Sequence, residues 1–397
     1  MGSRFGAALV TVAAACALLV GAAPSQAAYP LAQNGRIVFE HVDTGSDDIW
    51  IINPDGSGAT NLTKTADPIF NFQPAISPNA QQIAYVRDDG GPNGSDLWVM
   101  NVDGSGQHPL IPGTPEADET PTYSPDGRML AFVRCSAGNC NVFLAGADGS
   151  NPHPLTTFPP AGAGQGAYAP TFSPDGRTIA FEHYVNTGGF SDIWAIGVDG
   201  SGQTDLTKTT STPVFLEFTP DYSPDGQWIT YARSEMSGTF IGLMNADGSS
   251  QSSITAGHNG NERYPAFSPD GKQLVFVGSS SAPYQHVQLM NPDGSNRRPV
   301  TAQDATNEYD PAWEHVYMCG GRRATIIGSD SGESLKGTKG PDVIVANGGK
   351  DTIKGLKGKD RICGGAGKDK LIGGKGKDRC VGGPGKDKGK GCEKGKI

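Results

Sequence analysis

The sequence predicts an all-β protein, with a six-bladed β-propeller followed by a small C-terminal β-roll-like domain. Two repeats predict this fold class. Between residues 34 and 316, the turn markers Ser-Pro-Asp-Gly and Asp-Gly-Ser recur with short apolar runs between them. From residue 337 onward, a glycine-rich unit of nine residues carries one aspartate in each copy. Repeats of about 45 residues are typical of propeller blades, and nonapeptide repeats are typical of coiled β-structures.

The first 28 residues predict a secretory signal peptide. They contain Arg4, an apolar run over residues 7–23, and small residues at Ser25 and Ala27. That run is too short and too rich in alanine for a membrane span, and no later stretch has the roughly 20 apolar residues that a bilayer requires. We expect a protein without a stable membrane span that is secreted, or held in the cell envelope or periplasm. A lipid anchor at Cys16 is the weaker alternative.

Each unit of the first repeat contains four short strands. Proline presets the first corner of a turn, aspartate bonds the turn's backbone, and glycine takes the left-handed position. Runs such as residues 83–86 and 130–133 have the β-branched and aromatic content of buried strands. The spacing of 48 residues between the first two Asp-Gly-Ser markers (103 − 55) is that of a blade. The markers start at Asp55, Asp103, Asp148, Asp199, Asp247 and Asp293.

The two ends of this region complement each other. The first unit lacks an opening strand, whereas residues 310–313 look like an opening strand with no unit behind it. Pairing them would close the ring and remove exposed sheet edges. An aromatic residue stands five positions before four of the six Asp-Gly-Ser markers and is expected to fill space between blades. Gly242 and Gln288 replace it in the last two units, which predicts looser packing there.

The markers resemble those of the TolB-like propeller family, built from WD40-like PD40 repeats, over most of residues 34–316, and we expect the propeller domain to occupy residues 29–318. The resemblance implies a six-bladed propeller that serves as a protein-binding scaffold and has no chemistry of its own. The short marker turns should share one face, so we expect a protein or cell-envelope partner on the opposite face, where loops are longer. Loop acids predict an acidic rim there: Asp88, Asp89, Glu116, Asp118, Glu119, Glu182, Glu217, Glu235 and Glu262.

An enzyme is the alternative to a binding scaffold. No Gly-x-Ser-x-Gly motif occurs, and no catalytic residue is predicted. A propeller-fold lyase or hydrolase acting on extracellular carbohydrate could instead hold a metal with histidines near the central channel. Three or more histidines or acids within reach of one metal at the channel would favour that alternative. The histidines are His41, His108, His153, His183, His258, His286 and His315.

The second repeat occupies residues 319–397 and has the pattern Gly-Gly-x-Gly-x-Asp-x-apolar-x. It resembles the RTX, or haemolysin-type, calcium-binding repeat. In that family two copies form one coil, so residues eighteen apart stack. A degenerate first copy has Glu333 in the aspartate position. The apolar position, expected to point inward, is held by Leu335, Ile344, Ile353, Ile362 and Leu371. The resemblance implies that Ca²⁺ is bound by Asp342, Asp351, Asp360, Asp369, Asp378 and Asp387.

Departures from the family pattern leave two alternatives open. Lysine precedes five of the six aspartates (Lys350, Lys359, Lys368, Lys377 and Lys386), which should weaken calcium binding. One alternative is therefore a roll pinned by disulfides that needs no metal. The other is a basic end that binds an anionic polymer non-specifically, without aromatic residues to stack on bases. That basic end comprises Lys386, Lys388, Lys390, Lys394 and Lys396.

The cysteines and charges fit an exported protein in two parts. Six cysteines remain after the signal peptide, an even number that favours disulfides. Cys135 and Cys140 flank a turn and should pair, whereas Cys319, Cys363, Cys380 and Cys392 allow three pairings, with Cys363 and Cys380 about one coil apart. From residue 319 onward, 19 Lys+Arg oppose 9 Asp+Glu, a charge of +10. Because the net charge of the whole chain is −9, the rest of the chain carries −19.

Overall fold

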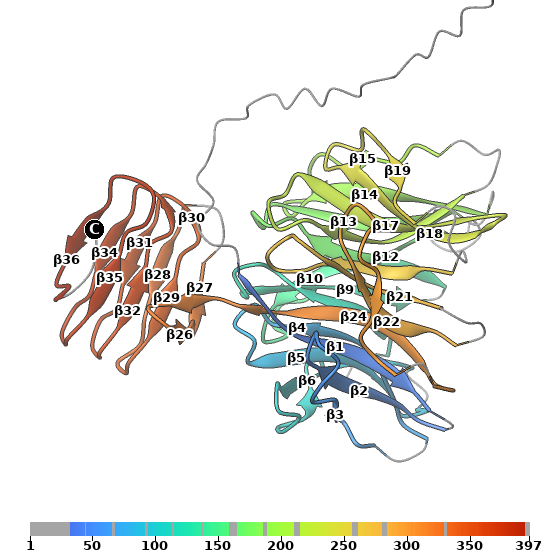
Figure 1. Ribbon diagram of the computed structural model, residues 1–397, viewed down its shortest axis with the longest axis horizontal. Helices are drawn as coiled ribbons and strands as arrows, with labels where there is room; N and C mark the ends of the chain where they lie inside the picture. Colours follow the sequence, from blue (N-terminus) through green and yellow to red (C-terminus); the bar gives the residue numbers. More distant parts are fainter. Residues whose placement is uncertain are drawn as a thin grey trace, which may run out of the picture.

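A computed structural model describes residues 32–43, 45–65, 68–91, 94–112, 115–136, 138–158, 165–185, 189–209, 215–255, 261–279, 284–302, 304–328 and 332–393. The predicted signal peptide and Cys16 lie outside these ranges. Every regular element in them is a β-strand, so the predicted all-β class is confirmed. The strands form two bodies, a propeller and a smaller roll of stacked strands (Figure 1). Within the same ranges, no helix is long and apolar enough to cross a membrane.

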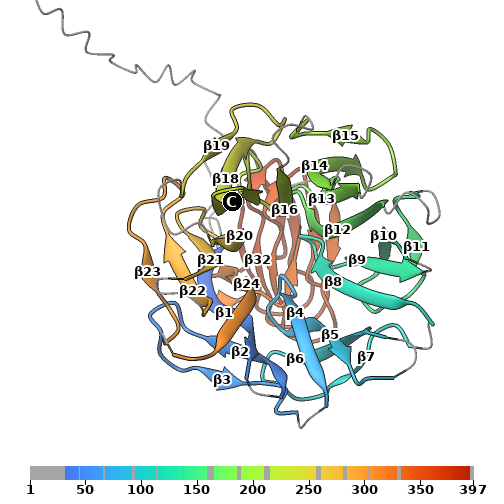
Figure 2. The same cartoon turned by 90° about the vertical axis from the view of Figure 1, so that its right-hand side faces the viewer.

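The first 24 described strands form six blades of four strands each, around one axis (Figure 2). In each blade the strands follow one another from the centre outward. The blades are β4 (Phe70–Ile76), β5 (Gln82–Asp88), β6 (Asp96–Asn101), β7 (His108–Pro109); β8 (Ala117–Tyr123), β9 (Met129–Ser136), β10 (Asn139–Gly146), β11 (His153–Pro154); β12 (Gln165–Phe172), β13 (Thr178–Val185), β14 (Phe190–Gly197), β15 (Thr204–Asp205); β16 (Leu216–Tyr222), β17 (Trp228–Glu235), β18 (Gly238–Asn245), β19 (Ser252–Ser253); β20 (Arg263–Phe267), β21 (Leu274–Gly278), β22 (His286–Met290), β23 (Arg298–Pro299); and the closing blade β24 (Asn307–Val316), β1 (Gln33–Val42), β2 (Asp47–Ile52), β3 (Thr60–Asn61).

The ring closes as the sequence predicts. Strand β24 is the inner strand of the blade that contains β1, and the two pair antiparallel, with Ile37 opposite Trp313. Both residues are buried in a cluster with Val275 and Val287 of the preceding blade. Closure therefore pairs the free edge of β1 and joins the two ends of the propeller through a shared apolar core.

Every inner strand contains a bulge that the sequence analysis did not anticipate. In each blade the ladder to the second strand shifts register at a residue with a φ between 46° and 54°, followed by proline. A bulge of this kind bends the strand. It also places the proline, which has no N–H to donate, at a position where the ladder needs no hydrogen bond. The six bulge residues are Gln73, Thr120, Ala169, Thr219, Tyr264 and Asp310.

The Ser-Pro-Asp-Gly turns interlock around one face of the propeller. In the turn at Ser124, the serine hydroxyl donates to Asp126 Oδ1 at 2.6 Å, and Gly127 has a positive φ of 68°. A Cβ on Gly127 would lie 3.6 Å from the ring of Pro78 in the previous blade. Because strand direction alternates, these turns and the Asp-Gly-Ser turns lie on the same face, called here the turn face. The opposite face is called the loop face.

The prediction of looser packing in the last two units, at Gly242 and Gln288, is wrong. At Gly242 the space is filled by Tyr231, because a Cβ there would lie 2.5 Å from that ring. Gln288 is buried and donates to the Gly278 carbonyl at 2.6 Å while accepting from Arg297 Nε at 2.7 Å. A ring from the neighbouring strand and a polar network therefore replace the missing aromatic residues.

The roll is a solenoid of stacked parallel strands. Its pairs join residues eighteen apart, as in Ile344 opposite Ile362, so two nonapeptides form each coil, as predicted. The inward positions Leu335, Ile344, Ile353, Ile362 and Leu371 are all at most 1% exposed. One wall, called here the covered wall, is β27 (Ile326–Ile327), β29 (Val343–Val345), β32 (Arg361–Cys363) and β35 (Arg379–Val381); the other, the open wall, is β28 (Ser334–Lys336), β31 (Thr352–Lys354), β34 (Lys370–Ile372) and β36 (Lys388–Lys390); a turn carries β30 (Gly348–Gly349) and β33 (Ala366–Gly367).

A short hairpin covers one wall and is held there by a disulfide. Strands β25 (Met318–Cys319) and β26 (Arg322–Arg323) lie over the covered wall, where Cys319 and Ala324 pack with Val345 and Cys363. Cys319 is bonded to Cys363 and Cys380 to Cys392, so the coil-to-coil proximity of Cys363 and Cys380 does not correspond to a bond. The predicted Cys135–Cys140 bridge is confirmed across β9 and β10.

Candidate functional site

The aspartates of the roll form two files, one along each edge. After the first aspartate of each file, Asp Oδ1 accepts the backbone N–H of the aspartate one coil earlier: Asp360 from Asp342 at 2.9 Å, and Asp378 from Asp360 at 3.0 Å. The second file repeats this at 2.9 Å from Asp351 to Asp369 and from Asp369 to Asp387. The nonapeptide period therefore stacks the carboxylates vertically, because the coil returns to the same edge every eighteen residues.

The second carboxylate oxygen is buried and makes no hydrogen bond within the described residues. This holds for Oδ2 of Asp360, Asp369 and Asp378, whose residues are at most 2% exposed. Burying an ionised oxygen without a partner is costly, so a cation is the expected complement. These oxygens are the strongest structural indication of a ligand in the roll.

Glycines make room beside those oxygens. A Cβ on Gly364 would lie 2.7 Å from Asp369 Oδ2 and 2.7 Å from the carbonyl oxygen of Gly382. At Gly337 the corresponding distances are 2.6 Å to Asp342 Oδ2 and 2.7 Å to the Gly355 carbonyl, although this Oδ2 also accepts the N–H and the hydroxyl of Thr338. Carboxylate and carbonyl oxygens therefore converge on spaces that any side chain would fill. Both are the oxygen types that Ca²⁺ prefers, so these residues fit a calcium ion.

The electrostatics of the files agree with a cation site. Burial, and then the charge of Asp378 and Asp342, raises the pKa of Asp360, although the N–H of Asp342 opposes the shift. Burial and the charge of Asp387 likewise raise the pKa of Asp369, against the N–H of Asp351. Stacked carboxylates repel one another, and a divalent ion between coils would relieve the repulsion.

The lysines that precede the aspartates do not neutralise them. In the part of the chain that the structure describes, no ion pair joins a roll lysine to an aspartate, and these lysines are exposed. Burial explains this, because the aspartates lie inside the roll whereas the lysines beside them face solvent. The expected competition from lysine is therefore a field effect across solvent, which salt screens.

At one end of the second file, the glutamate of the degenerate first copy forms an ion pair with an arginine of the propeller. Glu333 replaces aspartate, and its carboxylate lies 3.0 Å from the Arg128 guanidinium of a Ser-Pro-Asp-Gly turn. Its backbone N–H still donates to Asp351 Oδ1 at 2.8 Å. The propeller thus supplies a positive charge at the end of the file nearest to it, which joins the two bodies.

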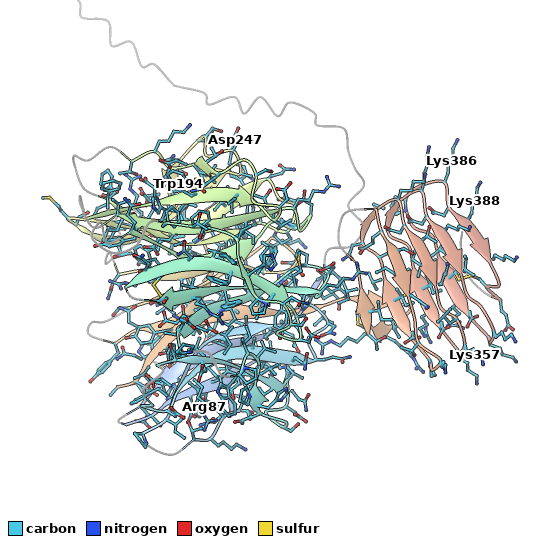
Figure 3. The ribbon with its side chains drawn as sticks, turned by 180° about the vertical axis from the view of Figure 1, so that it is seen from behind. Arg87, Trp194, Asp247, Lys357, Lys386 and Lys388 are labelled. Atoms are coloured by element: carbon cyan, nitrogen blue, oxygen red, sulfur yellow. A yellow bond between two sulfur atoms is a disulfide. The ribbon has the colours of Figure 1, made fainter. Side chains whose placement is uncertain are left out.

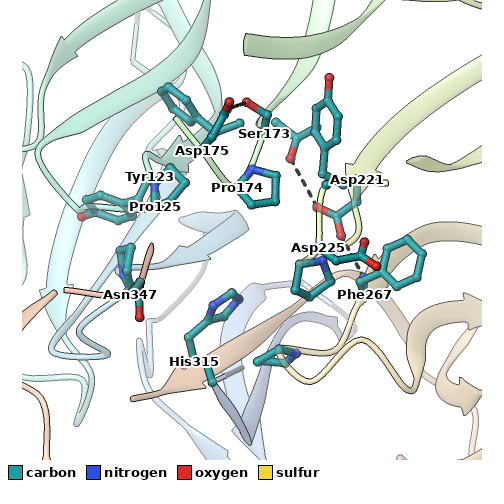
Figure 4. Close-up of a pocket in the computed structure, with 18 of the residues that line it drawn as sticks. Tyr123, Pro125, Ser173, Pro174, Asp175, Asp221, Asp225, Phe267, His315 and Asn347 are labelled. Atoms are coloured by element: carbon teal, nitrogen blue, oxygen red, sulfur yellow. Dashed lines mark hydrogen bonds between the residues drawn. The ribbon is translucent and has the colours of Figure 1, made fainter. Parts of the chain in front are cut away.

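A cavity of about 1370 Å³ lies where the roll meets the turn face (Figure 4). The propeller contributes inner-strand residues and a ring of turn prolines, and the roll contributes small turn residues such as Asn347 and Gly348. Burial raises the pKa of Asp221 to about 7, against hydrogen bonds from Phe267 N–H and Thr171 Oγ1. Burial lowers the pKa of His315 to about 4, so this imidazole is neutral at pH 7. The sequence showed no signal for this cavity, since residues from both bodies form it.

Only some of the predicted rim acids are exposed charges. Asp118, Glu217 and Glu262 are 0% exposed. Each faces an arginine: Asp118 with Arg134 at 2.7 Å, Glu217 with Arg233 at 3.7 Å, and Glu262 with Arg297 at 2.7 Å. The predicted acidic rim is wrong for these three, because they neutralise arginines between strands and blades. Asp88, Asp89, Glu116 and Glu235 keep solvent contact at the loop face.

One set of histidine and acidic side chains comes within reach of a single metal ion. His286 Nδ1 lies 3.0 Å from Glu308 Oε2, with Asp304 nearby and His41 Nδ1 3.6 Å from Glu308 Oε1. Glu308 Oε2 also accepts from the Thr301 hydroxyl at 2.9 Å. None of the four lines the cavity at the channel mouth; they lie at the seam between the last two blades. The set resembles the acid and base pairs of the other blades and gives no specific support to an enzyme.

The remaining histidines are dispersed. His108 and His153 are exposed and bond nearby carbonyls, and His183 stacks on Phe158 with ring centroids 4.2 Å apart. His258 lies outside the described residues. Of the described histidines, His315 alone lines the cavity at the channel mouth, so they do not meet there as the enzyme alternative requires.

Comparisons with known proteins agree with both bodies. The family model of the TolB beta propeller domain, PD40, matches residues 32–317, and that of the RTX calcium-binding nonapeptide repeat matches residues 327–362 and 355–388. An uncharacterized protein of Agrobacterium fabrum is 29% identical over 164 residues, 41% of this chain and 52% of that protein. The match thus spans about half the length of this curated relative.

Two solved structures show the same propeller. TolB from Acinetobacter baumannii has a TM-score of 0.57 and 20% identity, covering 70% of this chain and 66% of its own. Putative TolB from Agrobacterium tumefaciens has a TM-score of 0.52 and 22% identity, covering 71% and 99%. At these identities the likeness shows the fold alone, whereas the family match covers most of the sequence. The chain belongs to the TolB β-propeller family and carries RTX-type nonapeptide repeats at its C-terminal end.

Proposed function

We propose that this protein is an exported TolB-like propeller that binds a protein partner and carries a C-terminal domain that binds calcium. The proposed parts are a signal peptide over 1–28, the propeller over 29–318 and the repeat domain over 319–397. The observation that carries the calcium proposal concerns the buried Oδ2 atoms of Asp360, Asp369 and Asp378, which have no hydrogen-bond partner among the described residues and each lie beside a glycine space.

The proposed calcium ligands are Asp342, Asp351, Asp360, Asp369, Asp378 and Asp387. The Oδ1 atoms of the five later aspartates hold the preceding coil in register, and the Oδ2 atoms, with glycine carbonyls, would hold the ion. At the start of one file, Asp342 Oδ2 also accepts the N–H and the hydroxyl of Thr338. Calcium would supply the charge that the stacked carboxylates lack. Because each carboxylate links two coils, ion binding and folding of the roll should be coupled.

The loop face is the proposed site for a protein partner. The roll lies against the turn face, at the channel mouth, and leaves the loop face uncovered (Figures 1 and 2). Exposed acids remain there, such as Asp88 and Asp89, so a partner with a basic surface fits best. Three disulfides support an oxidising compartment, outside the cytoplasm.

Calcium titration of the mature full-length chain tests the metal proposal. Isothermal calorimetry and far-ultraviolet circular dichroism should show saturable binding with a gain of β signal at millimolar calcium or below. Asp360→Ala and Asp378→Ala should each reduce the number of bound ions, whereas Asp89→Ala, an exposed loop control, should not. Absence of binding with the disulfides intact would overturn the proposal in favour of a roll pinned by disulfides alone.

Crosslinking in an envelope extract, followed by binding to the purified partner, tests the scaffold proposal. Asp88→Lys combined with Asp89→Lys should weaken that complex, because it reverses charge on the loop face. Lys272→Glu reverses charge in a turn-face marker and is the matched control. A complex weakened by the control alone would place the partner on the turn face instead.

A further inference from the structure

The roll separates its charges by depth. The described part from residue 332 to 393 contains 15 Lys+Arg and 8 Asp+Glu, a net charge of +7. Five of the six aspartates are at most 5% exposed, whereas every lysine is exposed. These lysines are Lys336, Lys339, Lys350, Lys354, Lys357, Lys359, Lys368, Lys370, Lys375, Lys377, Lys386, Lys388 and Lys390. The solvent-facing surface of the roll is therefore strongly basic (Figure 3).

Coil stacking arranges the cations in files. On the open wall Lys336 pairs with Lys354, and Lys370 pairs with Lys388. On one edge Lys357 bridges to Lys375. Neighbouring strands in a sheet lie about 4.8 Å apart, so the two lysines of each open-wall pair lie about that far apart along the stack. Ile372 interrupts the file between Lys354 and Lys390, whereas Lys339, Lys357 and Lys375 follow one another at intervals of eighteen residues on the edge. These cations form a linear array along the stack of coils.

The two edges of the roll differ. The third position of each nonapeptide is lysine on the edge of Lys339, Lys357 and Lys375, whereas the other edge has Gly348, Ala366 and Pro384. The small residues of that second edge line the cavity against the propeller. The covered wall is shielded by the 317–324 segment. The open wall and the Lys357 edge thus remain as the accessible basic surface.

The chain itself does not neutralise this surface. Among the ion pairs between described residues, none includes a lysine of the roll. The nearby carboxylates lie inside, with Oδ1 committed to backbone N–H groups. Each calcium ion that enters the aspartate files adds a charge of +2 to a body that is already positive. Calcium should therefore strengthen the field that attracts an anion.

We infer that the open wall and the Lys357 edge bind a linear anionic polysaccharide, and that calcium loading of the roll turns this binding on. The inference rests on the proposed calcium function. Calcium acts twice: it holds the coils that place the lysines in files, and it cancels the buried negative charge behind them. By linkage, the polymer raises calcium affinity by the same factor that calcium raises polymer affinity.

The chemistry of the surface favours a polysaccharide over a nucleic acid. Residues 319–397 contain no phenylalanine, tyrosine or tryptophan, so this domain offers bases no aromatic stacking platform. Carboxylate or sulfate groups on a flexible sugar chain need only a file of point charges, which lysine supplies. Binding of this kind should fall steeply with salt.

The test uses the mature full-length protein and fluorescent dextran sulfate, with uncharged dextran as the blank. Calcium should raise affinity for dextran sulfate at least tenfold over the chelated protein. The variant Lys354→Gln/Lys370→Gln/Lys388→Gln/Lys390→Gln should lose at least tenfold in affinity, while Lys64→Gln/Lys208→Gln/Lys272→Gln on the propeller should change little. Calorimetry with calcium alone reports whether the open-wall variant still binds the metal and folds.

The outcomes separate this inference from the calcium proposal. If no calcium binds, the calcium proposal fails and the inference fails with it. If calcium binds but polymer affinity is the same with and without it, or the open-wall variant binds as the wild type does, the inference alone is overturned. Tighter binding of a single-stranded oligonucleotide or of anionic lipid vesicles than of dextran sulfate would also overturn the choice of polymer.

Discussion

Asp369 lies in the middle of one carboxylate file, where a change of one atom should have opposite effects with and without calcium. Its Oδ1 accepts the N–H of Asp351 at 2.9 Å, and its Oδ2 is buried without a hydrogen-bond partner among the described residues. Asp369→Asn keeps the first acceptor. It replaces the second oxygen by an N–H donor that borders the same space at Gly364 as the Gly382 carbonyl, and it removes one of the repelling charges.

The expected sizes follow from these contacts. Without calcium, satisfying a buried polar atom should stabilise the roll by about 1 kcal/mol. With calcium at about 100 times the dissociation constant, one site contributes about 2.7 kcal/mol, so its loss outweighs that gain by about 1.7 kcal/mol. Protection against hydrogen exchange should therefore rise about fivefold in chelator and fall about 16-fold in calcium, at about 1.4 kcal/mol for each factor of ten.

Hydrogen exchange with mass spectrometry, on peptides from residues 342–390, measures both values. Tryptophan fluorescence would not, because the repeat domain has no aromatic residue. Asp89→Asn is the control and should leave both values unchanged. A variant that is destabilised equally in chelator and in calcium would refute the reasoning, since the carboxylate would then be a structural group with no bound ion.

Three further effects should be measurable. Burial raises the pKa of Asp221 to about 7, so its ionisation favours the unfolded state, and the free energy of unfolding of the propeller should fall by on the order of 3 kcal/mol between pH 4 and pH 7. Asp221→Asn should flatten the dependence of that free energy on pH over this range. Asp118→Ala should cost about 3 to 5 kcal/mol in urea unfolding because it leaves the largely buried guanidinium of Arg134 without its carboxylate partner. Glu235→Ala, at the surface, should cost less than about 1 kcal/mol. Replacing Cys380 and Cys392 by serine opens a short loop, and should lower protection of the last coil by about 3 kcal/mol in hydrogen exchange while leaving the propeller unchanged.

The acids of the loop face show what sequence reasoning could not resolve. Their positions in loops and at strand starts predicted exposure, but three of them are buried against arginines. The partners lie 16 to 35 residues away, and nothing in the local pattern distinguishes a paired acid from an exposed one. The pairs are Asp118 with Arg134, Glu217 with Arg233, and Glu262 with Arg297.

A repeated threonine carried a signal that the sequence analysis missed. In five blades a threonine hydroxyl accepts the backbone N–H of the residue fourteen positions earlier, at 2.9 to 3.1 Å. The constant offset is visible in the sequence once the blades are aligned. It satisfies a buried donor where the short outer strand ends. The residues are Thr63, Thr156, Thr207, Thr255 and Thr301.

The sequence by itself determined the blade count and the nine-residue spacing of the aspartates, because both features repeat along the chain and follow from local turn chemistry and strand alternation. It also indicated the ring closure, because the first unit lacks the strand that residues 310–313 supply. Stacking at intervals of eighteen was implied by the resemblance to RTX repeats. Only the tertiary structure decided that the roll lies against the turn face, that Arg128 meets Glu333, and that a cavity forms between the two bodies. Each of these depends on single, unrepeated contacts between residues far apart in the chain, which no periodic pattern encodes.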